Sequence, residues 1–162
     1  MHIERELIVS ELDEIYRGPA WHGPALLESL DGVDAKLACR HIAPGRNTIW
    51  DLVLHLAHGR HILIERIRAA AFDFPRSIRE PWWPHPPTDT SDEAWRRDLA
   101  LLDEYHRMLI DAVRDASDAQ LARGPEHGFQ SVARQLLGMA IHDAYHAGQI
   151  RLLTLIARDT NL

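Results

Sequence analysis

Glycine and proline divide this chain into four segments that are almost free of either residue. The interruptions fall at Gly18-Pro19, Gly23-Pro24, Pro44-Gly45, a proline cluster between residues 75 and 87, and Gly124-Pro125. Both residues disfavour the interior of a helix, so long helices are expected between the interruptions. Within the segments, apolar residues recur at three- and four-residue intervals, the spacing of an amphipathic helix. The pattern predicts four helices.

The first predicted helix covers about residues 3–16 and resumes after Pro24, so we expect a broken or kinked helix. The second begins after Asn47 or Thr48, because the side chain of either residue can cap a first turn. We expect this second helix to end near Phe72.

The third and fourth predicted helices follow the long proline-rich connection. The third begins at Ser91 or Asp92, and the fourth covers about residues 131–158. Residues at alternating four- and three-residue steps along the third helix have the pattern of a bundle seam: Trp95, Leu99, Leu102, His106, Leu109 and Val113. The inward stripe of the fourth helix is Val132, Met139, Ile150, Leu153 and Ala157.

The four segments favour an all-α four-helix bundle, a fold that builds its sites from side chains on facing helices. No stretch alternates apolar and polar residues over a useful length, so we expect no β-sheet. The connection between helices two and three is a stiff run, Glu80-Pro-Trp-Trp-Pro-His-Pro-Pro87. Its two tryptophans, Trp82 and Trp83, could plug the end of the bundle or line a substrate pocket.

Length and charge restrict the class of protein further. The 162 residues suit one domain, residues 1–162, and the net charge of -6 offers no attraction to phosphates, so we expect no nucleic-acid partner. No signal peptide and no membrane-spanning segment is recognisable, and we expect a cytoplasmic protein. The single cysteine, Cys39, excludes an internal disulfide and a cysteine-based zinc site. A metal site would therefore use histidine and carboxylate ligands.

Histidine is abundant, with 11 residues, and two of them form a chelating pattern. His142 and His146 are four positions apart, so on a helix they lie about 40° from one another and about 6 Å along the axis, on the inward side. On helix two, His55 lies at the edge of the apolar stripe, whereas we expect His58 and His61 on the surface. His55, His142 and His146 would form a three-nitrogen site with open coordination positions, as in catalytic metal sites.

Two further side chains are candidates for a supporting role. His106 lies on the inward seam and is either a buried core histidine, a group that supports a ligand, or a proton carrier. Gln149, like Gln135, shares a helix face with His142 and could orient a ligand or substrate. His142-Asp-x-x-His146 has a shorter acid than the zinc-protease motif and no third ligand downstream, so a peptidase is not expected. A ferritin-like di-iron site would need inward glutamates that this chain lacks.

Two segments resemble the motifs of the DinB/YfiT-like superfamily of metalloenzymes. They are Asn47-Thr-Ile-Trp-Asp-Leu-Val-Leu-His55-Leu and, some 80 residues later, His142-Asp-Ala-Tyr-His146-Ala-Gly-Gln-Ile150. The resemblance implies an up-down-down-up four-helix bundle. It also implies one divalent ion, such as zinc, nickel or iron, bound by one histidine of helix two and two of helix four. By position, these are His55, His142 and His146.

The resemblance implies less about the reaction. Some members of the family are similar to transferases or isomerases that use low-molecular-weight thiols such as bacillithiol, mycothiol or glutathione. We therefore expect a metal-dependent transferase or hydrolase that activates a thiol or water for attack on a small-molecule substrate. The alternatives are a non-catalytic metal-binding protein of the stress response, or histidines that bind no metal. The resemblance also suggests a homodimer.

Overall fold

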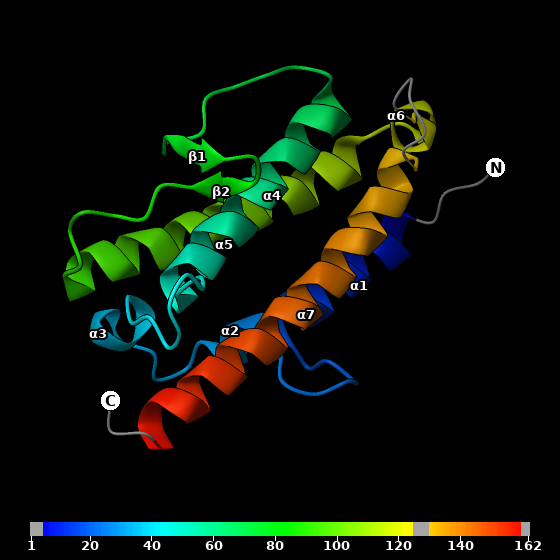
Figure 1. Cartoon of the computed structure of the whole chain (residues 1–162). Helices are drawn as coiled ribbons and strands as arrows, with labels where there is room; N and C mark the ends of the chain where they lie inside the picture. Colours follow the sequence, from blue (N-terminus) through cyan, green and yellow to red (C-terminus); the bar gives the residue numbers. More distant parts are fainter. Residues whose placement is uncertain (1–4, 125–129, 160–162) are drawn as a thin grey trace.

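The computed structural model describes residues 5–124 and 130–159. The expected domain covers residues 1–162, and its outermost residues lie outside the described ones. So does Pro125 of the last predicted interruption. Within the described residues the chain forms seven helices and two short strands (Figure 1). Four helices are long and correspond to the predicted segments: α1 Arg5–Arg17, α4 Ile49–Arg68, α5 Asp92–Asp115 and α7 Val132–Asp159. The predicted all-α class is confirmed, since most described residues are helical.

Side-chain hydrogen bonds cap the N-termini of two long helices, α4 and α5, at the residues that the sequence predicts. The Thr48 hydroxyl accepts a hydrogen bond from the Asp51 backbone N–H, and the Asp51 carboxylate accepts one in return from the Thr48 N–H. At the start of α5, the Ser91 hydroxyl accepts from the Ala94 N–H. Both arrangements satisfy N–H groups that have no partner within the helix, and thereby fix the first turn.

Helix α4 ends at Arg68, four residues before the predicted end at Phe72. Ala69 adopts a left-handed conformation with φ of 53°, and its N–H bonds to the Glu65 carbonyl. This is a common way for a helix to end, although glycine usually occupies the position. The Glu65 carboxylate then accepts a hydrogen bond from the Phe72 N–H, so the chain turns back along α4 instead of continuing the helix.

The first predicted helix is broken, not merely kinked. Helix α1 ends at Arg17, and Gly18 follows with φ of 87°, a conformation that glycine adopts without strain. The chain resumes as two separate short helices, α2 Leu26–Ser29 and α3 Ala35–Ala38. A further short helix, α6 Asp118–Ala122, precedes α7.

The expectation of no β-sheet is wrong in one place. Strands β1 Ile78–Glu80 and β2 Trp83–Pro84 form a small antiparallel sheet beside α4 in the long connection (Figure 1). Ile78 pairs with Pro84 and Glu80 with Trp83, with an irregular register between them. Strands of three and two residues are too short to show alternation in the sequence, which is why the pattern gave no indication of them.

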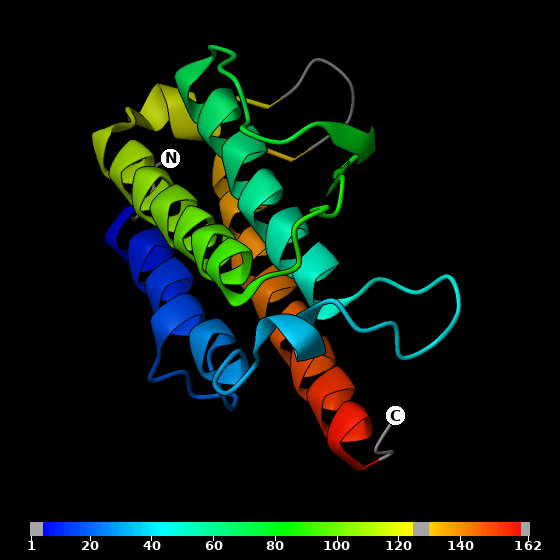
Figure 2. The same ribbon diagram turned by 90° about the vertical axis from the view of Figure 1, so that its left-hand side faces the viewer.

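The long helices pack against one another along much of their length (Figure 2). Helix α4 contacts α5 and α7, and α1 contacts the same two helices. Two clusters of buried apolar side chains fill the space between them. The predicted seam of α5 is buried throughout, except for the half-buried Leu99. Two indoles add fixed hydrogen bonds: Trp50 Nε1 donates to Asp98 and Trp95 Nε1 donates to the Val33 carbonyl, each at 2.8 Å.

None of the helices in residues 5–124 and 130–159 is long and apolar enough to cross a membrane.

Candidate metal site

Three histidines meet where the middle of α7 faces α4, and they are the three that helical spacing singled out. The Nε2 atom of His142 lies 3.0 Å from Nε2 of His55 and 3.0 Å from Nε2 of His146. The ligand atoms of all three lie within 4.8 Å of one another. His55 and His146 are buried and His142 is half-buried. No fourth histidine, cysteine or carboxylate joins this group among the described residues.

The opposite ring nitrogens determine which atoms of these histidines can bind a metal. Nδ1 of His55 lies 2.8 Å from the Trp82 carbonyl oxygen, and Nδ1 of His146 lies 2.6 Å from Oε1 of Gln149. Both oxygens are acceptors, so both Nδ1 atoms carry the proton and both Nε2 atoms present a lone pair. Metal-binding histidines in proteins usually donate their other N–H in this way. The Gln149 side chain thus accepts a hydrogen bond from His146.

The three Nε2 atoms cannot satisfy one another by hydrogen bonding alone. With lone pairs on His55 and His146, a single proton on His142 Nε2 can reach only one of its two neighbours. The other neighbour would retain a lone pair facing nitrogen at 3.0 Å. A cation between the three atoms would be coordinated by all of them, so the donor set fits a divalent metal ion.

Burial keeps these imidazoles in the neutral form that binds metals. Burial, with a smaller contribution from neighbouring histidines, lowers the pKa of His142 to about 3 and that of His146 to about 4, in the second case against the opposing effect of the hydrogen bond to Gln149. The pKa of His55 is also lowered by burial, which outweighs the hydrogen bond to the Trp82 carbonyl. A neutral imidazole is required for coordination, so little proton competition is expected near neutral pH.

A cavity of about 500 Å³ opens beside the three histidines. Its wall includes Trp83, whose ring stacks on the His55 ring at a centroid distance of 4.2 Å and an angle of 14°. Tyr145 and Arg46 line other parts of it. The volume is within the range of small-molecule sites. Of the two expectations for the tryptophan pair, Trp83 therefore lines a pocket at the histidines, and Trp82 contacts His55 through its backbone carbonyl.

The expectation that His58 and His61 lie on the surface is wrong. They are 7% and 5% exposed, because residues 69–77 fold back along α4. The Phe74 ring packs on His58 at 4.9 Å and the Phe72 ring packs on His61 at 4.4 Å, centroid to centroid. The prediction assumed one solvated face on α4, but the connection and four other helices, α3, α5, α6 and α7, contact it. Neither histidine belongs to the three-histidine group.

His106 is fully buried, in agreement with its position on the seam, but it is not part of the three-histidine group. Its Nε2 lies 3.1 Å from an Asp13 carboxylate oxygen, and its ring stacks on Tyr16 at 3.8 Å. Its contacts are therefore with α1, and they fit a core histidine. Gln135 also contacts a different partner, since its Oε1 accepts a hydrogen bond from Arg66.

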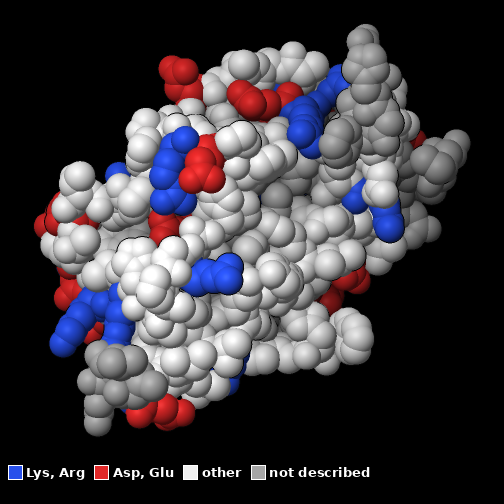
Figure 3. Space-filling model, in the orientation of Figure 1, with Lys and Arg blue, Asp and Glu red and all other residues white. Residues whose placement is uncertain are grey.

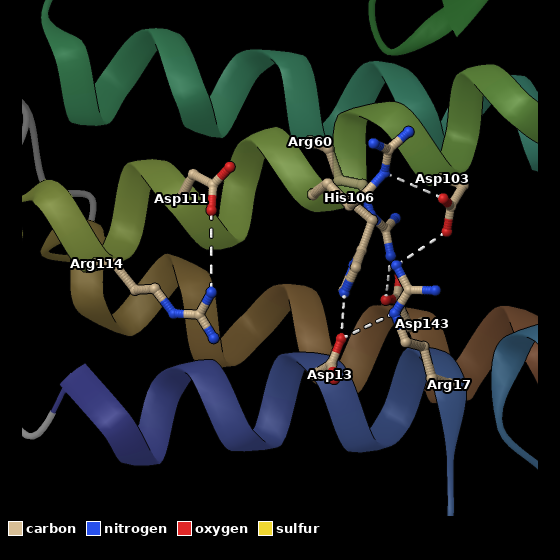
Figure 4. A network of polar contacts seen from close by, with 9 residues as sticks. Asp13, Arg17, Arg60, Asp103, His106, Asp111, Arg114 and Asp143 are labelled. Atoms are coloured by element: carbon tan, nitrogen blue, oxygen red, sulfur yellow. Dashed lines mark hydrogen bonds and ion pairs between the residues drawn. The ribbon is translucent and has the colours of Figure 1, made fainter.

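An ion pair that the sequence analysis missed lies directly behind the site. Arg60 of α4 donates to Asp143 of α7 at 2.5 Å, and neither side chain exposes any surface (Figure 4). The Arg60 guanidinium also lies 5.0 Å from the centre of the Tyr16 ring. Asp143 follows His142 directly, so the pair fixes α7 against α4 next to a site residue. An arginine amid the apolar residues of helix two was the signal in the sequence that could have indicated it.

The family model described as DinB superfamily matches residues 12–150. Neither the curated proteins nor the solved structures contain a match to this chain.

Proposed function

The chain belongs to the DinB superfamily, and from that premise we propose that His55, His142 and His146 bind one divalent metal ion, zinc, nickel or iron, in a metal-dependent enzyme. The observation that carries the proposal is that Nε2 of His142 lies 3.0 Å from Nε2 of both His55 and His146, while the Nδ1 atoms of His55 and His146 donate to other acceptors. We also propose that the long helices α1, α4, α5 and α7 form an up-down-down-up four-helix bundle.

We propose that the reaction is the transfer of a low-molecular-weight thiol, or else hydrolysis. A divalent ion held by three histidines supplies a Lewis acid that lowers the pKa of a thiol or water at an open position. The absence of a fourth protein ligand among the described residues supports this mechanism over a closed, structural site. The cavity of about 500 Å³ beside the histidines leaves space for a small-molecule substrate.

Side chains around the cavity would orient such a substrate. The Tyr145 hydroxyl accepts a hydrogen bond from Nε2 of Gln149, so its own O–H is available to donate to a substrate oxygen. Arg46 lines the same cavity and forms no ion pair among the described residues. Its guanidinium would attract the carboxylate of an anionic thiol such as glutathione.

The alternative is a metal-binding protein without turnover, acting in the stress response or in an interaction. Zinc-loaded protein incubated with glutathione or bacillithiol and 1-chloro-2,4-dinitrobenzene distinguishes the two. An enzyme of the proposed class gives metal-dependent turnover that is lost in His146→Ala and kept in His22→Ala, which changes an exposed histidine. Bound metal without turnover of these substrates or of p-nitrophenyl acetate would favour the non-catalytic alternative.

We also propose a homodimer formed through the outer face of α7. Four large apolar side chains are exposed along it, Ile141, Tyr145, Leu152 and Leu155, and two of them, Tyr145 and Leu152, also lie at the edge of the first cavity. Their separations of four, seven and three residues place them on one side of the helix. Figure 3 shows this face, where the surface over the middle of α7 carries few charged side chains. An apolar helix face of this kind is typical of an interface.

A further inference from the structure

A second cavity, of about 460 Å³, adjoins the histidines on their other side. It shares His55 and His142 with the first cavity. From there it follows α4 toward Arg66 and α7 toward Gln135, whereas the first cavity extends the opposite way along both helices. The two cavities therefore meet at the proposed metal ligands and form one groove between α4 and α7.

The two tryptophans of the small sheet divide this groove. Trp83 lines the first cavity and Trp82 lines the second. The Trp82 backbone has φ of 75°, a conformation that side-chain-bearing residues rarely adopt, and its carbonyl accepts the hydrogen bond from His55. Strained backbone of this kind persists where the surrounding structure holds it, often at a functional site. Here it places one indole on each side of His55.

Two glycines in the middle of helices form part of the second cavity. A Cβ atom on Gly59 would lie 3.0 Å from the Met139 methyl carbon, so a side chain at position 59 would crowd Met139. A Cβ atom on Gly138 would meet nothing within 4 Å. Glycine destabilises the interior of a helix, and at position 138 no neighbouring atom would clash with a larger side chain. Its effect is to leave the cavity open. Leu63 and Met139 make most of the remaining wall apolar.

Arg66 adds a positive charge to the rim of this apolar cavity. Its guanidinium hydrogen-bonds to the Gln135 side chain and lies 5.8 Å from the centre of the Trp82 ring. Both partners are uncharged, and among the described residues Arg66 has no carboxylate partner. A guanidinium with only neutral partners, beside apolar walls, is suited to bind an anionic group.

We propose that the second cavity binds a small amphipathic anion, with an apolar body between Gly138 and Trp82 and a carboxylate on Arg66. The inference rests on the proposed function, because such a molecule would be the electrophilic co-substrate that meets the activated thiol at the histidines. His55 and Arg66 are 11 positions apart on α4, a rise of about 16 Å. The Arg66 guanidinium bonds to Gln135, which lies seven positions before His142 on α7, a rise of about 10 Å, and this is the length available to the ligand.

Isothermal titration calorimetry on the zinc-loaded full-length protein tests this with two probes that differ in charge, 4-phenylbutyrate and 4-phenyl-1-butanol. We expect the carboxylate to bind at least about tenfold more tightly than the alcohol, as a charge-assisted hydrogen bond would give. In Arg66→Gln the two affinities should become equal. In Gly138→Leu both should fall at least about tenfold.

Gly148→Leu is the matched control. Gly148 is also an exposed glycine of α7, a Cβ atom added to it would meet nothing within 4 Å, and it lines neither cavity. Gly148 lies between Tyr145 and Leu152 on the face proposed for the dimer, but it lines neither cavity, so the affinities of this variant for both probes should equal those of the unchanged protein. The inference is overturned if the unchanged protein binds neither probe, if the carboxylate preference survives in Arg66→Gln, or if both leucine variants bind alike. The metal content of each sample distinguishes a failure of this inference from a failure of the proposed function. A protein that binds zinc but neither probe contradicts only the inference.

Discussion

Arg60 of α4 and Asp143 of α7 form an ion pair at 2.5 Å in which both side chains are completely buried. The Arg60 Nη1 atom also donates to the Leu56 carbonyl at 3.1 Å. Burial raises the pKa of the Asp143 carboxyl, and the adjacent guanidinium opposes that rise. The pair joins the two helices that carry the candidate site, one residue from His142.

Removal of one partner should destabilise the protein strongly. Arg60→Met leaves the Asp143 carboxylate buried without its counter-charge, and we expect a loss of about 3–5 kcal/mol in the free energy of unfolding. Urea denaturation measures it. Arg97→Met, which removes an exposed partner of Asp89, should cost no more than about 1 kcal/mol. The double variant Arg60→Met/Asp143→Leu should recover most of the loss, and a double variant no more stable than Arg60→Met would contradict this account of the pair.

Acid should destabilise the metal-free protein partly through His106. Burial and the nearby Arg60 charge lower its pKa in the folded state to about 3, whereas its ordinary value is 6.5. The unfolded chain therefore binds the proton first. The contribution of His106 is fully present above pH 6.5 and is lost progressively as the pH falls toward 3.

Replacement of His106 by phenylalanine keeps an aromatic ring against Tyr16 but removes this titration. Between about pH 6 and 4, the unfolding free energy of the unchanged protein should fall more steeply than that of His106→Phe, by about 1.4 kcal/mol per pH unit. Chemical denaturation at a series of pH values compares the two slopes. Parallel curves would show that the folded-state pKa of His106 is not lowered.

Gln149 should strengthen metal binding through His146. In Gln149→Leu the Nδ1 proton of His146 loses its acceptor, and losses of this type reduce metal affinity about 10- to 100-fold. Competition with a chromophoric chelator gives the affinity for zinc. Gln135→Leu, also on α7 but bonded to Arg66, should retain the affinity of the unchanged protein. Equal affinities in the two variants would exclude the proposed role of Gln149.

The outer face of α7 should determine the oligomeric state. Leu155 of α7 and Leu7 of α1 are both 52% exposed, so they form a matched pair. In sedimentation velocity, the unchanged protein and Leu7→Glu should both sediment as a dimer. Leu155→Glu should shift the population toward the monomer, because a charge would be buried in an apolar interface. If Leu155→Glu still sediments as a dimer, the interface must lie on another surface.

Much of the site was predictable because it depends on spacing along two helices. The four-position spacing of His142 and His146 places both rings on one side of any helix, and the apolar stripes fix which side faces inward. The starts of α4 and α5 were predictable for a similarly local reason, since Thr48 and Ser91 cap through residues only three positions away.

What the sequence did not show depends on segments far apart in the chain. The burial of His58 and His61 results from the return of residues 69–77 over α4, which no periodicity within α4 can indicate. The Arg60–Asp143 pair joins residues 83 positions apart. The hydrogen bond from His55 to the Trp82 carbonyl requires a backbone conformation that the tryptophan side chain disfavours.

The central claim is that three histidines bind one metal ion, and metal content tests it most directly. Protein purified without a histidine tag and analysed by mass spectrometry should contain about one divalent ion per chain. His55→Ala and His146→Ala should each lose it while remaining folded, and His22→Ala should retain it. Absence of metal from the unchanged protein after incubation with zinc, nickel and ferrous iron, or its retention in both folded site variants, would contradict the account.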